Sequence, residues 1–130
     1  MIKKIFKTTL AAVFSVMLVS TAIAKEGAFN MHAFEKAQAK GEMIVVDVFK
    51  KGCGTCAKQK PILNLAKEIY PDAKFVKVNF KKDKEAVKHF KAVKQSTIIV
   101  YKGKEEVARS LGETDKSELI AMISKGFESE

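Results

Sequence analysis

The feature that most restricts the fold of this chain is an apolar stretch at 42–49, with the sequence EMIVVDVF. It has the length of one β-strand, and its centre is rich in the β-branched residues that strands favour. Neighbouring side chains of a strand point to opposite faces, so a stretch that is apolar at nearly every position must be covered on both. The stretch therefore predicts a central strand between two layers of helices. After Glu42 at its start, Asp47 is its only charged residue, and we expect this carboxyl group to be largely buried.

Capping residues, turn residues and apolar periodicity predict the remaining elements. Helices are predicted at 30–40, 56–70, 83–90 and 115–126, and further strands at 75–80, 97–101 and 105–110. The expected caps are Asn30, Asp83 and the capping-box pair Asp115 and Glu118, and the helix at 56–70 is expected to bury Ile62, Leu65, Ala66 and Ile69. Two strands joined by a helix predict a parallel unit, and the turn at 102–104 predicts an antiparallel hairpin. The predicted fold class is α/β, with one mixed sheet of about four strands and helices on both faces.

The first 24 residues have the pattern of a secretory signal peptide. The pattern consists of Lys3, Lys4 and Lys7, an apolar run at 10–19, and the small residues of Ala22-Ile23-Ala24 at the expected cleavage site. An uncleaved membrane anchor is the alternative, but the apolar run is shorter than the roughly 20 residues that cross a bilayer. We expect cleavage after Ala24, a periplasmic or secreted protein, and a single domain at 25–130.

The chain contains two cysteines, Cys53 and Cys56, which are separated by two residues. A bridge that closes so short a loop removes little entropy from the unfolded chain, so a structural staple explains the pair poorly. In an exported domain, a lone Cys-x-x-Cys indicates thiol–disulfide exchange. His32 and His89 do not have the spacing of a common zinc site. We therefore expect no bound metal, and no cofactor other than a redox-active disulfide.

Disulfide exchange requires a thiolate as its nucleophile. We expect Cys53 at the start of a helix, where backbone N–H groups and the helix dipole stabilise negative charge. Cys56, one turn further on, would then resolve the mixed disulfide. Gly54 is expected to provide a tight turn between them. A buried Asp47 would have a raised pKa, which suits general acid–base work near neutral pH.

The chain is basic, with a formal net charge of +9 that falls to +6 without the three lysines of the predicted signal peptide. The lysines gather at 81–94 and, around the cysteines, at Lys50, Lys51, Lys58 and Lys60. Nucleic-acid binding is not expected, because no recognition motif or interleaved aromatic residue accompanies them, and a solvated helical face explains 81–94. The lysines near the cysteines are candidates for stabilising a thiolate or attracting acidic partners.

Several segments together resemble the thioredoxin family. They are Val45–Phe49, Cys53-Gly54-Thr55-Cys56, Pro61 five residues beyond the second cysteine, Lys77, Thr97–Tyr101, the Lys102-Gly103 turn and Gly112. The resemblance covers essentially all of 25–130. It implies a thioredoxin fold, protein-disulfide exchange, and an Asp47 that serves Cys56 from beneath the site.

Two positions depart from the family pattern. Gly52 stands where thioredoxins have tryptophan, and Ser96 stands where they have a cis-proline that orients the partner. The substrate-binding residues that the resemblance implies are Gly52, Gly54, Thr55, Gln95 and Ser96. A cis bond before a residue other than proline costs about 2.5–4 kcal/mol, so we predict a trans Gln95–Ser96 bond. The amide hydrogen and the hydroxyl of Ser96 would then both be donors toward a thiolate.

These features favour an enzyme, a monomeric thiol:disulfide oxidoreductase. The favoured activity is reduction of, or electron relay to, disulfides of exported proteins, with recycling by a membrane electron-transfer partner. A disulfide oxidase or isomerase is one alternative, and a non-catalytic binding or metal-carrier module is another. The two enzymatic activities share every site residue and differ in reduction potential, whereas a non-catalytic module would tolerate loss of the cysteines.

Overall fold

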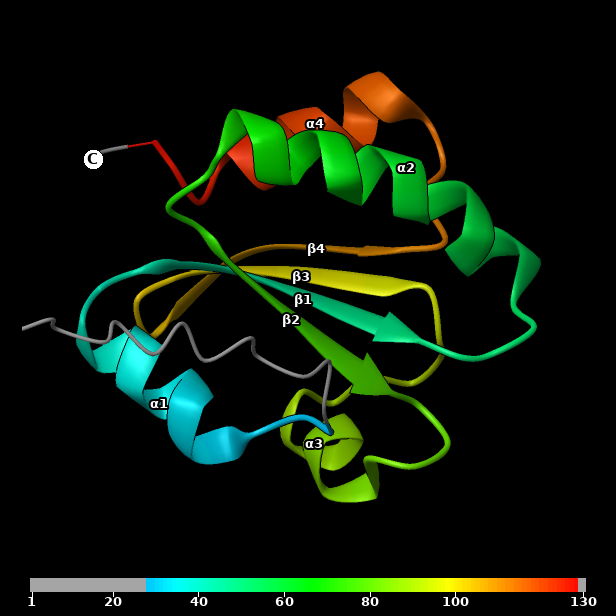
Figure 1. Ribbon diagram of the computed structural model, residues 1–130, viewed down its shortest axis with the longest axis horizontal. Helices are drawn as coiled ribbons and strands as arrows, with labels where there is room; N and C mark the ends of the chain where they lie inside the picture. Colours follow the sequence, from blue (N-terminus) through cyan, green and yellow to red (C-terminus); the bar gives the residue numbers. More distant parts are fainter. Residues whose placement is uncertain (1–27, 129–130) are drawn as a thin grey trace, which may run out of the picture.

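The computed structural model describes residues 28–128, which form four helices and four strands in the predicted order. The elements are α1 (Met31–Ala39), β1 (Met43–Phe49), α2 (Gly54–Ile69), β2 (Lys74–Asn79), α3 (Lys84–His89), β3 (Thr97–Lys102), β4 (Glu105–Leu111) and α4 (Lys116–Ser124) (Figure 1). The predicted signal peptide at 1–24 lies outside the described residues and stays a prediction. None of the helices within 28–128 has the length and hydropathy of a membrane span.

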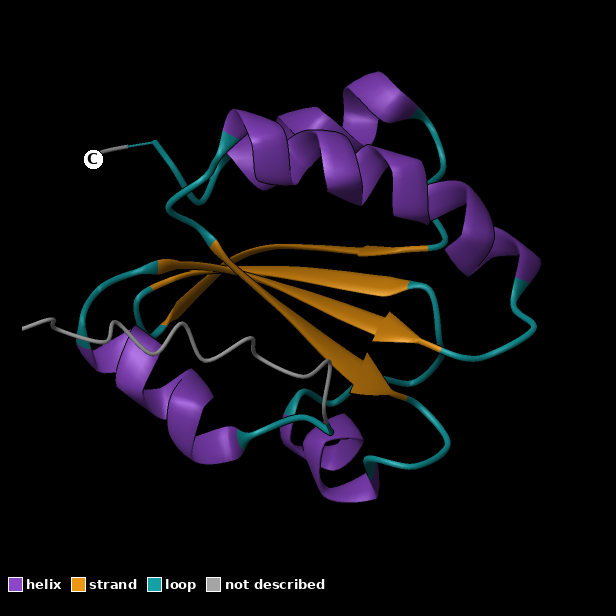
Figure 2. Cartoon of the chain, in the orientation of Figure 1, coloured by secondary structure: helices purple, strands orange, loops and turns teal. Residues whose placement is uncertain are grey.

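The strands form one mixed sheet in the order β2-β1-β3-β4. β1 pairs parallel with β2 and antiparallel with β3. β3 and β4 form the predicted antiparallel hairpin, in which Gly103 has a φ of +57°. α1 and α3 cover one face of the sheet, while α2 and α4 cover the other (Figure 2). The predicted α/β class, with β1 inside a mixed four-stranded sheet, is confirmed.

Alternation along β1 divides the core into two layers. The layer against α1 and α3 includes Phe34, Ile44, Val46, Val48 and Phe90. The layer against α2 and α4 includes Val45, Ile62, Ala66, Leu119 and Ile123. Because Asp47 alternates with Val46 and Val48, its side chain lies on the same face as Val45. The strand period therefore directs this carboxyl group toward the side of the sheet that α2 covers.

α2 buries a slightly different face from the predicted one. Ile62 and Ala66 are buried as expected, but Leu63 is buried as well and Ile69 is 46% exposed. Tyr70, at the end of the helix, packs against the core layer in place of Ile69. The helical period of 3.6 residues explains the exchange, because Leu63, Ala66 and Tyr70 fall on one side of the helix.

The predicted caps of α3 and α4 are only partly formed. Asp83 precedes α3, but its Oδ2 accepts a hydrogen bond from the N–H of Asn79 at 2.7 Å and makes no cap bond to the helix. Asp115 caps α4 by accepting from the N–H of Glu118 at 2.9 Å. The reciprocal bond of the capping box is made by Glu113, whose Oε1 accepts from the N–H of Asp115 at 2.7 Å. Both helices still begin where expected, because the acidic side chains order the loops before them.

Candidate active site

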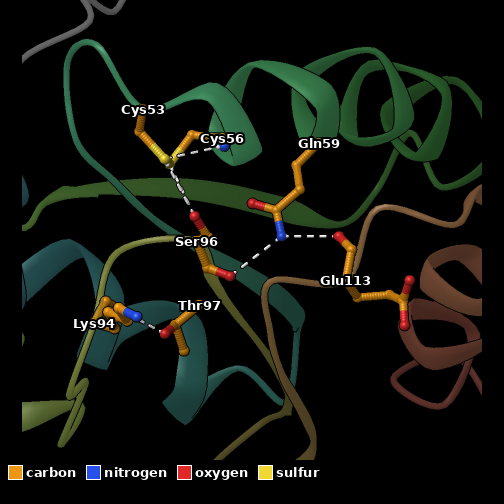
Figure 3. The surroundings of a disulfide bond; sticks show 7 residues. All are labelled: Cys53, Cys56, Gln59, Lys94, Ser96, Thr97 and Glu113. Carbon is orange, nitrogen blue, oxygen red and sulfur yellow. Dashed lines mark hydrogen bonds between the residues drawn. A yellow bond between two sulfur atoms is a disulfide. The ribbon is translucent and has the colours of Figure 1, made fainter.

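Cys53 is the N-cap residue of α2, and Cys56 lies one turn further along the same helix. The two cysteines form a disulfide with their Cα atoms 5.2 Å apart (Figure 3). The Sγ of Cys53 accepts a hydrogen bond from the N–H of Cys56 at 3.1 Å. Such N–H groups, together with the helix dipole, stabilise negative charge at a helix N-terminus. The position of Cys53 therefore favours a thiolate there once the disulfide is reduced.

The glycine with a positive φ beside the cysteines is Gly52, immediately before them, whereas the tight turn was expected at Gly54, between them. Gly52 has a φ of +77°, which glycine adopts without the strain that a Cβ brings. Gly54 is the first residue of α2 and does not have a positive φ. A Cβ added at either position would meet no atom within 4 Å. Backbone conformation, and not space, is therefore the reason for glycine immediately before Cys53.

The hydroxyl group of Ser96 contacts both cysteines. Ser96 lies immediately before β3 and is only 5% exposed, and no cis peptide bond occurs within 28–128, so the predicted trans Gln95–Ser96 bond is confirmed. Its Oγ lies 3.2 Å from the Sγ of Cys53 and 3.3 Å from the Sγ of Cys56. A disulfide sulfur has no proton to give, so the hydroxyl group is the donor. One side chain therefore touches both reacting atoms.

The amide hydrogen of Ser96 is not available to a thiolate, which corrects the sequence-based expectation. It donates to the carbonyl of Val48 in β1 at 2.8 Å, and the carbonyl of Ser96 accepts from the N–H of Gly112 at 2.9 Å. These bonds hold Ser96 at a φ of +64°. A residue other than glycine in this region carries strain of about 1–3 kcal/mol, which persists only where the surrounding structure enforces it.

Gln59 is part of the site that sequence reasoning missed. Its side chain is fully buried, and its Nε2 donates to the carbonyl of Ser96 at 3.2 Å and to the carbonyl of Glu113 at 3.0 Å (Figure 3). Its Oε1 is buried without a hydrogen-bond partner among the described residues. The sequence did contain one sign of this role, because Gln59 is a polar residue in line with Ile62 and Ala66 on the apolar face of α2. Gln59 thus ties the cysteine helix to the Ser96 loop.

Asp47 lies near the cysteines with a raised pKa. Burial is the largest cause of the shift, and the positive charges of Lys77 and then Lys67 oppose it. The predicted direction and cause are confirmed, and the residue is largely buried with a minor part exposed. Asp47 is paired in register with Lys77 of β2, and it lines a cavity of about 410 Å³ together with Cys53 and Cys56. Solvent in this cavity can connect the carboxyl group with the sulfurs.

The residues predicted to bind substrate line a second cavity, of about 460 Å³, on another side of the disulfide. These are Gly52, Gly54, Thr55, Gln95 and Ser96, which lie there with Cys53. The lining also includes two charged residues, Lys50 and Lys94, and the apolar residue Leu111. The structure therefore brings together two segments that are about 40 residues apart in the chain.

The two histidines lie apart from this site. His89 packs edge-on against Phe34 and Phe90, at ring-centroid distances of 6.0 and 5.0 Å. Within 28–128, no group of three or more histidine, cysteine, aspartate or glutamate residues is arranged to hold a metal ion. The reactive groups that the described site does contain are the two sulfur atoms of Cys53 and Cys56.

Comparison with known proteins agrees with this chemistry. The model of the thioredoxin family matches residues 25–125. The thioredoxin of Chlamydia pneumoniae is 34% identical over 93 residues, which cover 71% of this chain and 89% of that protein. The crystal structure of Trxlp from Edwardsiella tarda EIB202 is 36% identical, covers 74% of this chain and 95% of that one, and superposes with a TM-score of 0.70. Fasciola hepatica thioredoxin is 27% identical, over 73% of this chain and 92% of that one, with a TM-score of 0.65.

Proposed function

This chain belongs to the thioredoxin family, and we propose that it reduces, or relays electrons to, disulfides of exported proteins through a Cys53/Cys56 cycle. The family assignment makes it a protein-disulfide oxidoreductase. The proposed location is supported by the signal-peptide pattern at 1–24. In that location the oxidised pair needs a source of electrons, for which a membrane electron-transfer protein is the proposed partner.

The proposed cycle moves two electrons from the cysteine pair to the target. The Cys53 thiolate attacks one target sulfur, which forms a mixed disulfide and releases the other target sulfur as a thiolate that takes up a proton. Cys56 then loses its proton and attacks the Sγ of Cys53. This step forms the Cys53–Cys56 disulfide and releases the second target sulfur, which is protonated in turn. The target gains two thiols, and the enzyme is left oxidised.

The single observation that carries this proposal is the placement of Cys53 as the N-cap of α2, with Cys56 one turn further along the helix. The N-cap sulfur is the one that N–H groups and the dipole favour as a thiolate. We assign two supporting roles. Asp47 accepts the proton of Cys56 through solvent in their shared cavity, and the Ser96 hydroxyl stabilises whichever sulfur is negative.

The reduction potential tests the direction of the reaction. We expect equilibration with a glutathione couple to give a reduction potential close to that of a reducing thioredoxin, about −270 mV. A strong disulfide oxidant has a potential of about −120 mV. The reduced protein should also cleave the interchain disulfides of insulin, a model substrate. A potential at the oxidising end, with net formation of disulfides in a reduced substrate, would assign the protein to the oxidase or isomerase class instead.

Asp47→Asn should slow disulfide exchange near neutral pH by about tenfold. General acid–base groups contribute about 10²–10⁴-fold, and solvent in the open cavity replaces part of this contribution. The rate of insulin reduction between pH 6 and pH 9 measures the loss, and the wild-type and variant profiles should differ in shape. Identical pH profiles would remove Asp47 from the mechanism.

The same substitution should raise stability at neutral pH. Because the pKa of Asp47 is raised above its ordinary value of 3.8, the native state retains a proton that the unfolded state loses first as the pH rises. This group therefore lowers the free energy of unfolding as the pH rises from about 3.8 through its folded pKa. The stability of Asp47→Asn relative to wild type should increase across that window and then level off. Urea unfolding at a series of pH values measures the difference.

A further inference from the structure

The two cavities beside the disulfide are lined by charges that are almost all positive. The charged residues of the first cavity are Asp47, Lys50, Lys60, Lys67 and Lys77. Those of the second are Lys50 and Lys94. Among residues 28–128, Asp47 is thus the only one that contributes a carboxyl group to either lining, and it is largely buried. A target that approaches the disulfide from either side meets ammonium groups.

Three of these lysines are placed to meet a partner. Lys60 and Lys94 are exposed, and Lys50, which borders both cavities, is half-buried. Within the part of the chain that the structure describes, none of these three ammonium groups forms an ion pair. A carboxylate from a partner would therefore not have to displace an internal one.

The backbone N–H and carbonyl groups of Ser96 are already hydrogen-bonded within the protein. Its N–H is bonded to Val48, and its carbonyl oxygen accepts from both Gly112 and Gln59. A partner strand consequently cannot gain a main-chain hydrogen bond from the Ser96 N–H without breaking the loop. Beside the lysines, the second cavity offers a partner one apolar side chain, Leu111, which is 54% exposed.

We propose that the preferred targets of this protein carry acidic residues next to the disulfide that they present. The inference rests on the proposed oxidoreductase function and names its substrate class. An extended target segment with its sulfur at Cys53 borders both cavities. Its carboxylates beside the second cavity meet Lys50 and Lys94. Its carboxylates beside the first cavity meet Lys60. Opposite charges accelerate encounter at a protein surface, and salt screens this attraction.

Two oxidised peptides test the proposal directly. Each contains one intramolecular disulfide, and they differ only in having glutamate or lysine beside the cysteines. We expect the dithiol form of the protein to reduce the acidic peptide about tenfold faster at about 0.01 M ionic strength, with the two rates converging near about 0.5 M. A rate ratio near one at low salt, or a preference for the basic peptide, would overturn the proposal.

The charge-reversal variant Lys50→Glu/Lys94→Glu should abolish or invert this ratio. Its matched control is Lys36→Glu/Lys40→Glu, which makes the same change in net charge at exposed positions on and just after α1, across the sheet from the cysteine helix. Because the readout is a ratio of two substrates, a change in thiolate reactivity cancels. A wild-type ratio in the Lys50 and Lys94 variant, or an equal loss in the control, would contradict the inference. Reduction of neither peptide would overturn the proposed function and this inference with it.

Discussion

Replacing Cys53 with serine should abolish disulfide reduction, whereas replacing Cys56 with serine should trap target proteins as mixed disulfides. The physical reason is the position of each sulfur in α2. Cys53 is the N-cap, where a thiolate is favoured and starts the exchange, and Cys56 supplies the second sulfur that releases the target. We expect turnover by Cys53→Ser to fall by at least about a thousandfold, as when an enzyme loses its nucleophile.

Non-reducing gel electrophoresis of each variant, after incubation with a disulfide-containing substrate, measures the trapping. Cys56→Ser should form a substrate adduct that dithiothreitol releases, and the double variant Cys53→Ser/Cys56→Ser should form none. Peptide mapping of the adduct should place the substrate sulfur on Cys53. Equal trapping by both single variants would show that the order of attack is wrong, and a double variant that keeps the protein's function in the cell would indicate a non-catalytic role.

Ser96→Ala should lower the reduction potential by about 30 to 60 mV. The hydroxyl group of Ser96 lies within 3.3 Å of both sulfurs and gains strength as a donor when one of them becomes a thiolate. A hydrogen bond to a charged group contributes about 1.5–3 kcal/mol, and about 30 mV corresponds to 1.4 kcal/mol for this two-electron couple. Loss of the bond destabilises the reduced form, so the disulfide becomes harder to reduce. Equilibration with a glutathione couple measures the shift.

Ser96→Gly separates the hydroxyl group from the backbone. Both variants lack the hydroxyl and should shift the potential in the same direction. Their stabilities should differ, because at a φ of +64° alanine keeps the strain of a Cβ and glycine relieves it. Urea unfolding should therefore show Ser96→Gly to be more stable than Ser96→Ala. An unchanged potential in both variants would show that the hydroxyl group does not stabilise the thiolate.

Most of the fold was predictable from the sequence because its signals are local. The apolar stretch at 42–49 predicted a central strand, and the structure places β1 between β2 and β3. The cysteine spacing and the glycine at 103 also act over a few residues, so they identified the redox pair and the hairpin. The predicted substrate-binding residues line one cavity, but it was their resemblance to a family that grouped them.

The conformation of Ser96 and the role of Gln59 were decided by the tertiary structure. Ser96 adopts a positive φ because bonds to Val48 and Gly112 hold its backbone, and the same bonds remove its amide hydrogen from the reaction. Gln59 reaches carbonyl groups 37 and 54 residues away in the chain. No local pattern contains such contacts. Hydrophobic periodicity shows which face of an element is buried, but only the packed chain determines which polar atoms meet there, because each buried donor must find a partner wherever the fold provides one.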